Sequence, residues 1–185
     1  MAGILKVDKY QDFNGNDIMT SDGSGNITMP SGVISGQNYP AFEAYRDVTA
    51  NLTNLSYSKI ECDTELFDTD NCYDNSTNYR FTPNVAGKYF VYAFAGVNTG
   101  GNSRLEQNWG VIYKNGNATI QAQNDYGANP IRINAVNVSG VIDMNGTTDY
   151  LEFYIYPESN SGTPNYLGSS GTYYRTAFGA YRIGA

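Results

Sequence analysis

The sequence predicts an all-β protein, and three observations lead to this fold class. Tyr and Phe are frequent, with 17 and 8 copies, whereas only 16% of the 185 residues are charged. Aromatic and β-branched residues favour strands. Gly, Asn and Asp recur between short apolar runs, as is typical of strands joined by tight turns. Runs of Ala, Leu, Glu and Lys, which would favour helices, are absent from the sequence.

The chain divides near residue 38 into two predicted regions. In residues 1–38, short strands are expected over residues 4–10, 17–20 and 26–29, with Asn-Gly and Asp-Gly turns between them. So few apolar residues cannot stabilise an isolated unit of this size. We therefore expect an N-terminal arm and linker that pairs with copies of itself or with a larger structure. Its anchoring residues would be Ile4, Leu5, Val7, Ile18 and Ile27.

The second region, residues 39–185, reads as a two-sheet sandwich. The turn Lys114-Asn115-Gly116-Asn117 is a strong hairpin signal between two of its strands. Short strands separated by turn residues at regular spacing are typical of a β-sandwich or jelly roll. The expected strands cover residues 42–45, 55–60, 80–81, 88–97, 109–114, 118–123, 131–144, 150–156 and 173–183.

Three of these strands are apolar on both faces, which predicts self-association. Residues 89–94, 150–156 and 173–183 carry aromatic side chains on alternate positions of either register. A strand with one solvent face should instead alternate apolar with polar residues. A large exposed apolar patch is unusual on a soluble monomer, so a second partner is expected. The alternative is that tyrosine, being amphipathic, simply tolerates exposure.

Composition argues against several function classes. A formal net charge of −7 disfavours nucleic acid, which requires Lys and Arg clusters, and disfavours an anionic membrane surface. The chain lacks a run of the roughly 20 apolar residues that span a bilayer, and its N-terminus lacks the pattern of a secretory signal. Because the sequence contains no His, Ser-His-Asp and Cys-His catalysis and His-ligated zinc are excluded. We expect no enzyme activity, no catalytic residues and no cofactor.

Three smaller features leave alternatives open. Cys62 and Cys72 could form a disulfide, although two free, buried thiols are preferred for a protein assembled in a cytoplasm. Trp109 could stack on a sugar or belong to the core. The acidic loop around residues 68–74 supplies hard oxygen ligands for calcium, but it lacks the Gly and Glu of an EF-hand, so a solvated loop is preferred. The possible calcium ligands are Asp68, Asp70 and Asp74.

Several short motifs in residues 42–183 resemble the C1q/TNF-like jelly roll, in particular the C1q-type globular head. In chain order they are Phe42-Glu43-Ala44, Phe67-Asp68 with Tyr73, Arg80-Phe81-Thr82-Pro83, Ala86-Gly87-Lys88-Tyr89-Phe90, Tyr113-Lys114-Asn115-Gly116, Ser139-Gly140-Val141-Ile142-Asp143-Met144, Asp149-Tyr150-Leu151 and Phe178-Gly179-Ala180-Tyr181-Arg182-Ile183. Two departures are the longer turn before Asp149 and the charged Arg182, and both bear on the packing of the last strand.

The resemblance implies a homotrimer whose inner sheets pack about a threefold axis. On this basis the interface residues would be Phe90, Tyr92, Phe94, Tyr154 and Tyr156. The protomer core would contain Val91, Leu151, Phe153 and Ile155. The opposite assignment of the two faces remains an alternative.

Residues 1–38 resemble the short N-terminal segments of tailed-bacteriophage virion proteins. That resemblance implies a structural virion component, a trimeric surface knob that decorates the capsid or forms a fibre-like appendage. Its partners would be further copies of the chain and other virion proteins, and its location the virion, assembled in the host cytoplasm. One alternative is a tail-fibre tip whose end loops, such as residues 158–171, bind a host receptor or glycan. The other is a secreted C1q-like binding protein.

Overall fold

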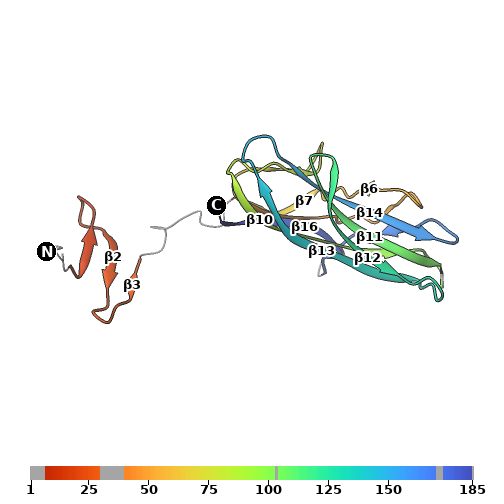
Figure 1. Cartoon of the computed structure of the whole chain (residues 1–185), viewed down its shortest axis with the longest axis horizontal. Coiled ribbons are helices and arrows are strands. Elements are labelled where there is room, and N and C mark those ends of the chain that lie inside the picture. Colours follow the sequence, from red (N-terminus) through yellow and green to blue (C-terminus); the bar gives the residue numbers. More distant parts are fainter. Residues whose placement is uncertain (1–6, 30–39, 103, 170–172, 185) are drawn as a thin grey trace. The chain divides into compact units, whose positions relative to one another are not determined.

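The computed structural model describes residues 7–29, 40–102, 104–169 and 173–184. Contacts between residues divide the chain into two compact units, Met1–Gln37 and Asn38–Ala185. The regular elements of the described residues are all strands, which confirms the predicted fold class (Figure 1). The described part of the chain contains no helix long and apolar enough to span a membrane.

The first unit is a small antiparallel sheet of β1 (Lys9–Gln11), β2 (Asp17–Ser21) and β3 (Ile27–Thr28). The turn between β1 and β2 is built around Asp12. Its carboxylate accepts hydrogen bonds from the backbone N–H groups of Asn14 and Asn16 and from the side-chain amide of Asn16. Asp22 makes the same three contacts in the turn β2–β3. The unit is therefore a repeated strand-and-loop motif.

This first sheet buries little apolar surface. Val7, Ile18 and Ile27, three of the expected anchoring residues, are exposed. Ile4 and Leu5 lie outside the described residues, as does most of the expected linker. A three-stranded sheet without an apolar face packed on something else is not stable on its own.

The second unit is a sandwich of two antiparallel sheets, named here by their longest central strands (Figure 1). In the β10 sheet, β10 pairs with β13 along one side and with β16 along the other. The strands of this sheet are β4 (Ala41–Tyr45), β5 (Ala50–Asn51), β7 (Thr64–Asp68), β10 (Gly87–Asn98), β13 (Ile133–Met144), β15 (Asn165–Tyr166) and β16 (Thr176–Gly184).

In the β11 sheet, β11 lies between β12 and β14. The strands of this sheet are β6 (Ser58–Lys59), β8 (Tyr73–Asp74), β9 (Arg80–Phe81), β11 (Leu105–Lys114), β12 (Asn117–Asp125) and β14 (Leu151–Ser159). The strand expected over residues 55–60 shortens to β6, because Leu55 has a φ of 56°, which a strand cannot adopt. Edge strand β7 was not predicted, since its exposed Glu65 and Leu66 break the apolar alternation.

The core between the sheets has an aromatic centre. Phe42 stacks on Tyr73 and on Phe81, each with ring centroids 4.5 Å apart, and meets Phe178 edge-on at 5.0 Å. The four residues expected in the protomer core are all fully buried: Val91, Leu151, Phe153 and Ile155.

Both cysteines are free and buried in this core, so the structure contains no Cys62–Cys72 bridge. Burial raises the pKa of the Cys62 thiol well above its ordinary value. Both side chains therefore act as small apolar residues.

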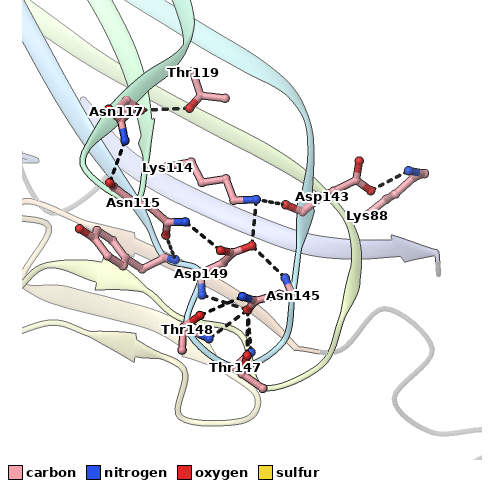
Figure 2. A network of polar contacts seen from close by, with 11 residues as sticks. Lys88, Lys114, Asn115, Asn117, Thr119, Asp143, Asn145, Thr147, Thr148 and Asp149 are labelled. Carbon is pink, nitrogen blue, oxygen red and sulfur yellow. Dashed lines mark hydrogen bonds and ion pairs between the residues drawn. The ribbon is translucent and has the colours of Figure 1, made fainter.

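The turn that joins β13 to β14 is fixed by the nearly buried carboxylate of Asp149 (Figure 2). It accepts hydrogen bonds from Lys114 Nζ at 2.8 Å, from Asn115 Nδ2 at 2.8 Å and from the backbone N–H of Asn145 at 3.0 Å. The contacts with Lys114 and Asn115 hold the pKa of Asp149 below its usual value. The longer turn is thus an ordered loop tied to the hairpin β11–β12.

The last strand is not disturbed by the two departures from the C1q-like motifs. β16 pairs with β10 from Lys88–Gly184 to Ala95–Thr176, with one irregularity at the Lys88 end. The Arg182 side chain donates a hydrogen bond to the Ala86 carbonyl at 3.1 Å, which gives this charged group a polar partner near the end of β16.

Candidate binding surfaces

Strand β10 lies at the centre of the β10 sheet and carries apolar side chains on both faces of that sheet. Tyr89 and Val91 point into the core and are fully buried. Phe90, Tyr92 and Phe94 point the opposite way and are half-buried. The outward side of the β10 sheet is therefore apolar at its middle rather than only at its rim.

Neighbouring strands extend this apolar area. The strand register places Phe90 between Val141 on β13 and Tyr181 on β16. Val141 is 52% exposed and Tyr181 is 38% exposed. The Phe90 ring lies 5.5 Å from Tyr181 and 6.2 Å from Tyr92, centroid to centroid. We name this area the β10 surface: Phe90, Tyr92, Phe94, Val141 and Tyr181.

One polar contact orients the middle of the β10 surface. The Tyr92 hydroxyl donates a hydrogen bond to Glu43 Oε2 at 2.7 Å. Burial, and then the contact with Glu43, raise the pKa of Tyr92. Gly179 lies between them, and a Cβ there would stand 2.5 Å from the Tyr92 ring, so only glycine lets the ring lie across β16.

A second aromatic area covers the outward side of the β11 sheet. A Cβ on Gly110 would meet Val136 of the opposite sheet at 3.2 Å, so Gly110 faces the core and Trp109 faces away from it. The rings of Trp109 and Tyr156 stack at 4.7 Å, and those of Tyr113 and Tyr154 lie 4.2 Å apart. Tyr57 contacts Trp109, Tyr113 and Tyr156. We name these five residues the Trp109 surface.

The structure does not bring the five residues expected at a trimer interface together. Phe90, Tyr92 and Phe94 belong to the β10 surface, whereas Tyr154 and Tyr156 belong to the Trp109 surface. The two surfaces lie on the outward faces of different sheets. Alternation along each strand located both sets on the side away from the core, but it carries no information on which sheet a strand joins.

The acidic loop uses its carboxylates to close turns. Asp68 accepts a hydrogen bond from the backbone N–H of Tyr73 at 2.7 Å. Asp74 accepts from the backbone N–H groups of Thr77, Ser76 and Asn78, and these contacts lower its pKa. Within the described residues, no three His, Cys, Asp or Glu side chains are grouped so that they could hold a metal ion. Calcium binding at Asp68, Asp70 and Asp74 is the less favoured alternative to a solvated loop, and it is untested.

The fold is similar to that of solved TNF-family proteins. The chain matches a crystal structure of murine APRIL at pH 5.0 with a TM-score of 0.54 and 10% identity, over 77% of this chain and 98% of that chain. It matches the structure of Eiger TNF from S. frugiperda with a TM-score of 0.51 and 11% identity, over 79% and 93%. No protein-family model and no curated protein matches the sequence.

These likenesses define the class of fold. The second unit is a C1q/TNF-like jelly roll, consistent with the resemblance seen in its motifs. At 10–11% identity the comparison shows the fold alone, so function has to be argued from the two surfaces.

Proposed function

We propose that the chain is a non-catalytic assembly and binding module that forms a homotrimer through its β10 surface. The observation that carries the proposal is the exposed apolar centre of the β10 sheet, where Phe90 is flanked by Val141 and Tyr181. A contiguous exposed apolar area at the middle of a sheet is more often a protein interface than a surface that stays in contact with solvent. The motifs that resemble the C1q-type head imply the same threefold arrangement of inner sheets.

In this proposal the trimer is a structural component of a tailed-phage virion, a knob on the capsid or on a fibre-like appendage. The exposed Val7, Ile18 and Ile27 of the first unit support attachment, since this small sheet requires a partner to bury them. The resemblance of residues 1–38 to phage virion proteins supports the location. The copy number per particle would separate a capsid decoration from an appendage.

Two matched substitutions test the assembly face. Tyr181→Glu places a charge on the β10 surface, and Tyr57→Glu places the same charge on the Trp109 surface. The two tyrosines have similar exposure, 38% and 40%, so neither change disturbs the protomer core. Sedimentation of the full chain should give three times 20.3 kDa for the wild type and for Tyr57→Glu, and a monomer for Tyr181→Glu.

Two results would overturn the proposal. One is a monomeric wild type at micromolar concentration, since no interface would then exist. The other is a trimer that Tyr57→Glu dissociates and Tyr181→Glu leaves intact, which would assign assembly to the Trp109 surface.

A further inference from the structure

The Trp109 surface is an ordered layer of rings rather than a set of separate exposed side chains. Val111 points to the same outward side as Trp109 and is nevertheless fully buried, because neighbouring side chains cover it. Ring contacts link all five aromatic residues into one cluster. Tyr57, at 40% exposure, lies at the solvent side of this cluster. Such a layer is preorganised, so its side chains would lose little conformational entropy when a ligand binds.

Neutral amides border the rings. Gln107 Oε1 accepts hydrogen bonds from Trp109 Nε1 and from Gln123 Nε2, both at 3.0 Å. The strand register places Gln121 beside Val111, next in line after Gln123 on the same face. An amide offers both donors and acceptors, which suits hydroxyl groups that can act in either role.

The charges near the rings disfavour an anionic ligand. Lys59 lies 5.8 Å from the centre of the Tyr154 ring, but its ammonium group is already paired with Glu152 at 2.6 Å. Glu158 stands opposite Gln107 in the register and adds a negative charge beyond Tyr156. The chain as a whole carries a formal charge of −7. A polyanion would be repelled, whereas a neutral polyhydroxylated molecule would not.

We infer that the Trp109 surface binds a neutral oligosaccharide of hexopyranose units. A pyranose with equatorial hydroxyls has a face of C–H groups, which carry partial positive charge, and an edge of hydroxyls. The C–H face stacks on the negative face of an aromatic ring. The hydroxyl edge meets Gln107, Gln121 and Gln123. This inference gives the proposed assembly an external ligand and does not depend on the trimer.

Trp109 provides a direct probe, because it is the only tryptophan in the chain. We would titrate the full chain with cellohexaose, chitohexaose and maltohexaose and follow tryptophan fluorescence, with polygalacturonate as an anionic probe. A saturable change is expected with at least one of the three neutral hexasaccharides and not with polygalacturonate. Tyr156→Ala and Tyr57→Ala keep the reporter and should each weaken binding about tenfold, as removal of a central aromatic contact does.

The Tyr181→Glu variant separates this inference from the trimer. It should bind the same hexasaccharide with unchanged affinity per site even when it is monomeric, because its substitution lies on the opposite sheet. The inference is overturned if none of the three hexasaccharides changes the fluorescence up to about 10 mM, where even millimolar affinity would be visible. Binding that survives both Tyr57→Ala and Tyr156→Ala unchanged, or equal binding of polygalacturonate, would also overturn it.

Discussion

The β10 surface and the Trp109 surface are both rich in aromatic residues and lie on opposite faces of one sandwich, yet they differ in the groups that surround the rings. The β10 surface includes solvent-exposed apolar side chains on the strands beside β10, namely Val141 and Tyr181. The Trp109 surface is bordered by amides and by a paired Lys59 and Glu152. An exposed apolar area without polar groups at its border favours a protein partner, whereas an aromatic area with hydrogen-bonding groups at its edge suits a small polar ligand.

The largest expected effect is a difference in unfolding free energy between two variants that each lose the lysine of a lysine–carboxylate pair. The two pairs have equal N–O distances, and one lies in each sheet. Lys59 and Glu152 of the β11 sheet, and Lys88 and Asp143 of the β10 sheet, both lie 2.6 Å apart. Glu152 is 6% exposed, so Lys59→Ala leaves a buried carboxylate without its cation and should cost about 3 kcal/mol of unfolding free energy. Lys88→Ala, in an exposed pair, should cost about 0.5 kcal/mol or less.

Urea denaturation of the two variants measures this contrast. Comparable losses for Lys59→Ala and Lys88→Ala would mean that the Lys59–Glu152 pair is not a buried support of the Trp109 surface.

A second change acts on the loop that ties both sheets together and should lower the stability of the protomer while leaving both surfaces intact. Asp149 links the turn after β13 to the hairpin of β11 (Figure 2). Asp149→Asn should destabilise the protein by about 2 kcal/mol near neutral pH, since charge-assisted hydrogen bonds are lost. Binding of the hexasaccharide and trimer mass should both be retained below the melting temperature.

The pH dependence of this loss follows from the lowered pKa of Asp149. Its stabilising contribution is complete above the ordinary value of 3.8 and disappears as the pH falls through the lower folded-state pKa. The stability difference between wild type and Asp149→Asn should therefore shrink below about pH 4. A difference that stays constant down to the acid-unfolding region would contradict the assigned role. Asp143→Asn, in an exposed pair, serves as the control.

The smallest change is confined to the β10 surface. Gly179→Ala would place a Cβ 2.5 Å from the Tyr92 ring, which must then move away from Glu43. We expect a protomer destabilised by about 1 kcal/mol and a trimer that dissociates at about tenfold higher concentration. Gly184→Ala, where nothing lies within 4 Å, should change neither quantity. Urea denaturation measures the stability of the protomer, and sedimentation over a concentration series measures dissociation of the trimer. An unshifted dissociation curve for Gly179→Ala would exclude Tyr92 from the interface.

Much of the fold could be predicted from the sequence, because the signals involved are local. The turn at Asn115-Gly116 and the enrichment of residues 88–97 and 150–156 in aromatic and apolar side chains depend only on near neighbours, and the structure has strands there. Edge strand β7 escaped prediction, since a strand paired on one side tolerates exposed Glu65 and Leu66. The short β15, Asn165–Tyr166, carries too little pattern to stand out.

The division of the aromatic residues into two surfaces could not be predicted. Tyr156 meets Trp109 because β14 pairs with β11, and Phe90 meets Tyr181 because β10 pairs with β16. Those pairings join residues far apart in the chain. Tyr57 is a further case, since it enters the Trp109 surface from the segment preceding β6 and no spacing in the sequence signals that contact.

Hydroxyl-radical footprinting of the full-length wild type against Tyr181→Glu tests the central claim most directly, because it reports both surfaces in one experiment. If the β10 surface is the assembly face, Phe90 and Tyr92 are protected in the wild type and become several-fold more reactive in the variant. Trp109 and Tyr57 react equally in both proteins. The opposite pattern, with Trp109 and Tyr57 protected in the wild-type assembly and Phe90 and Tyr92 equally reactive in both, would contradict the account.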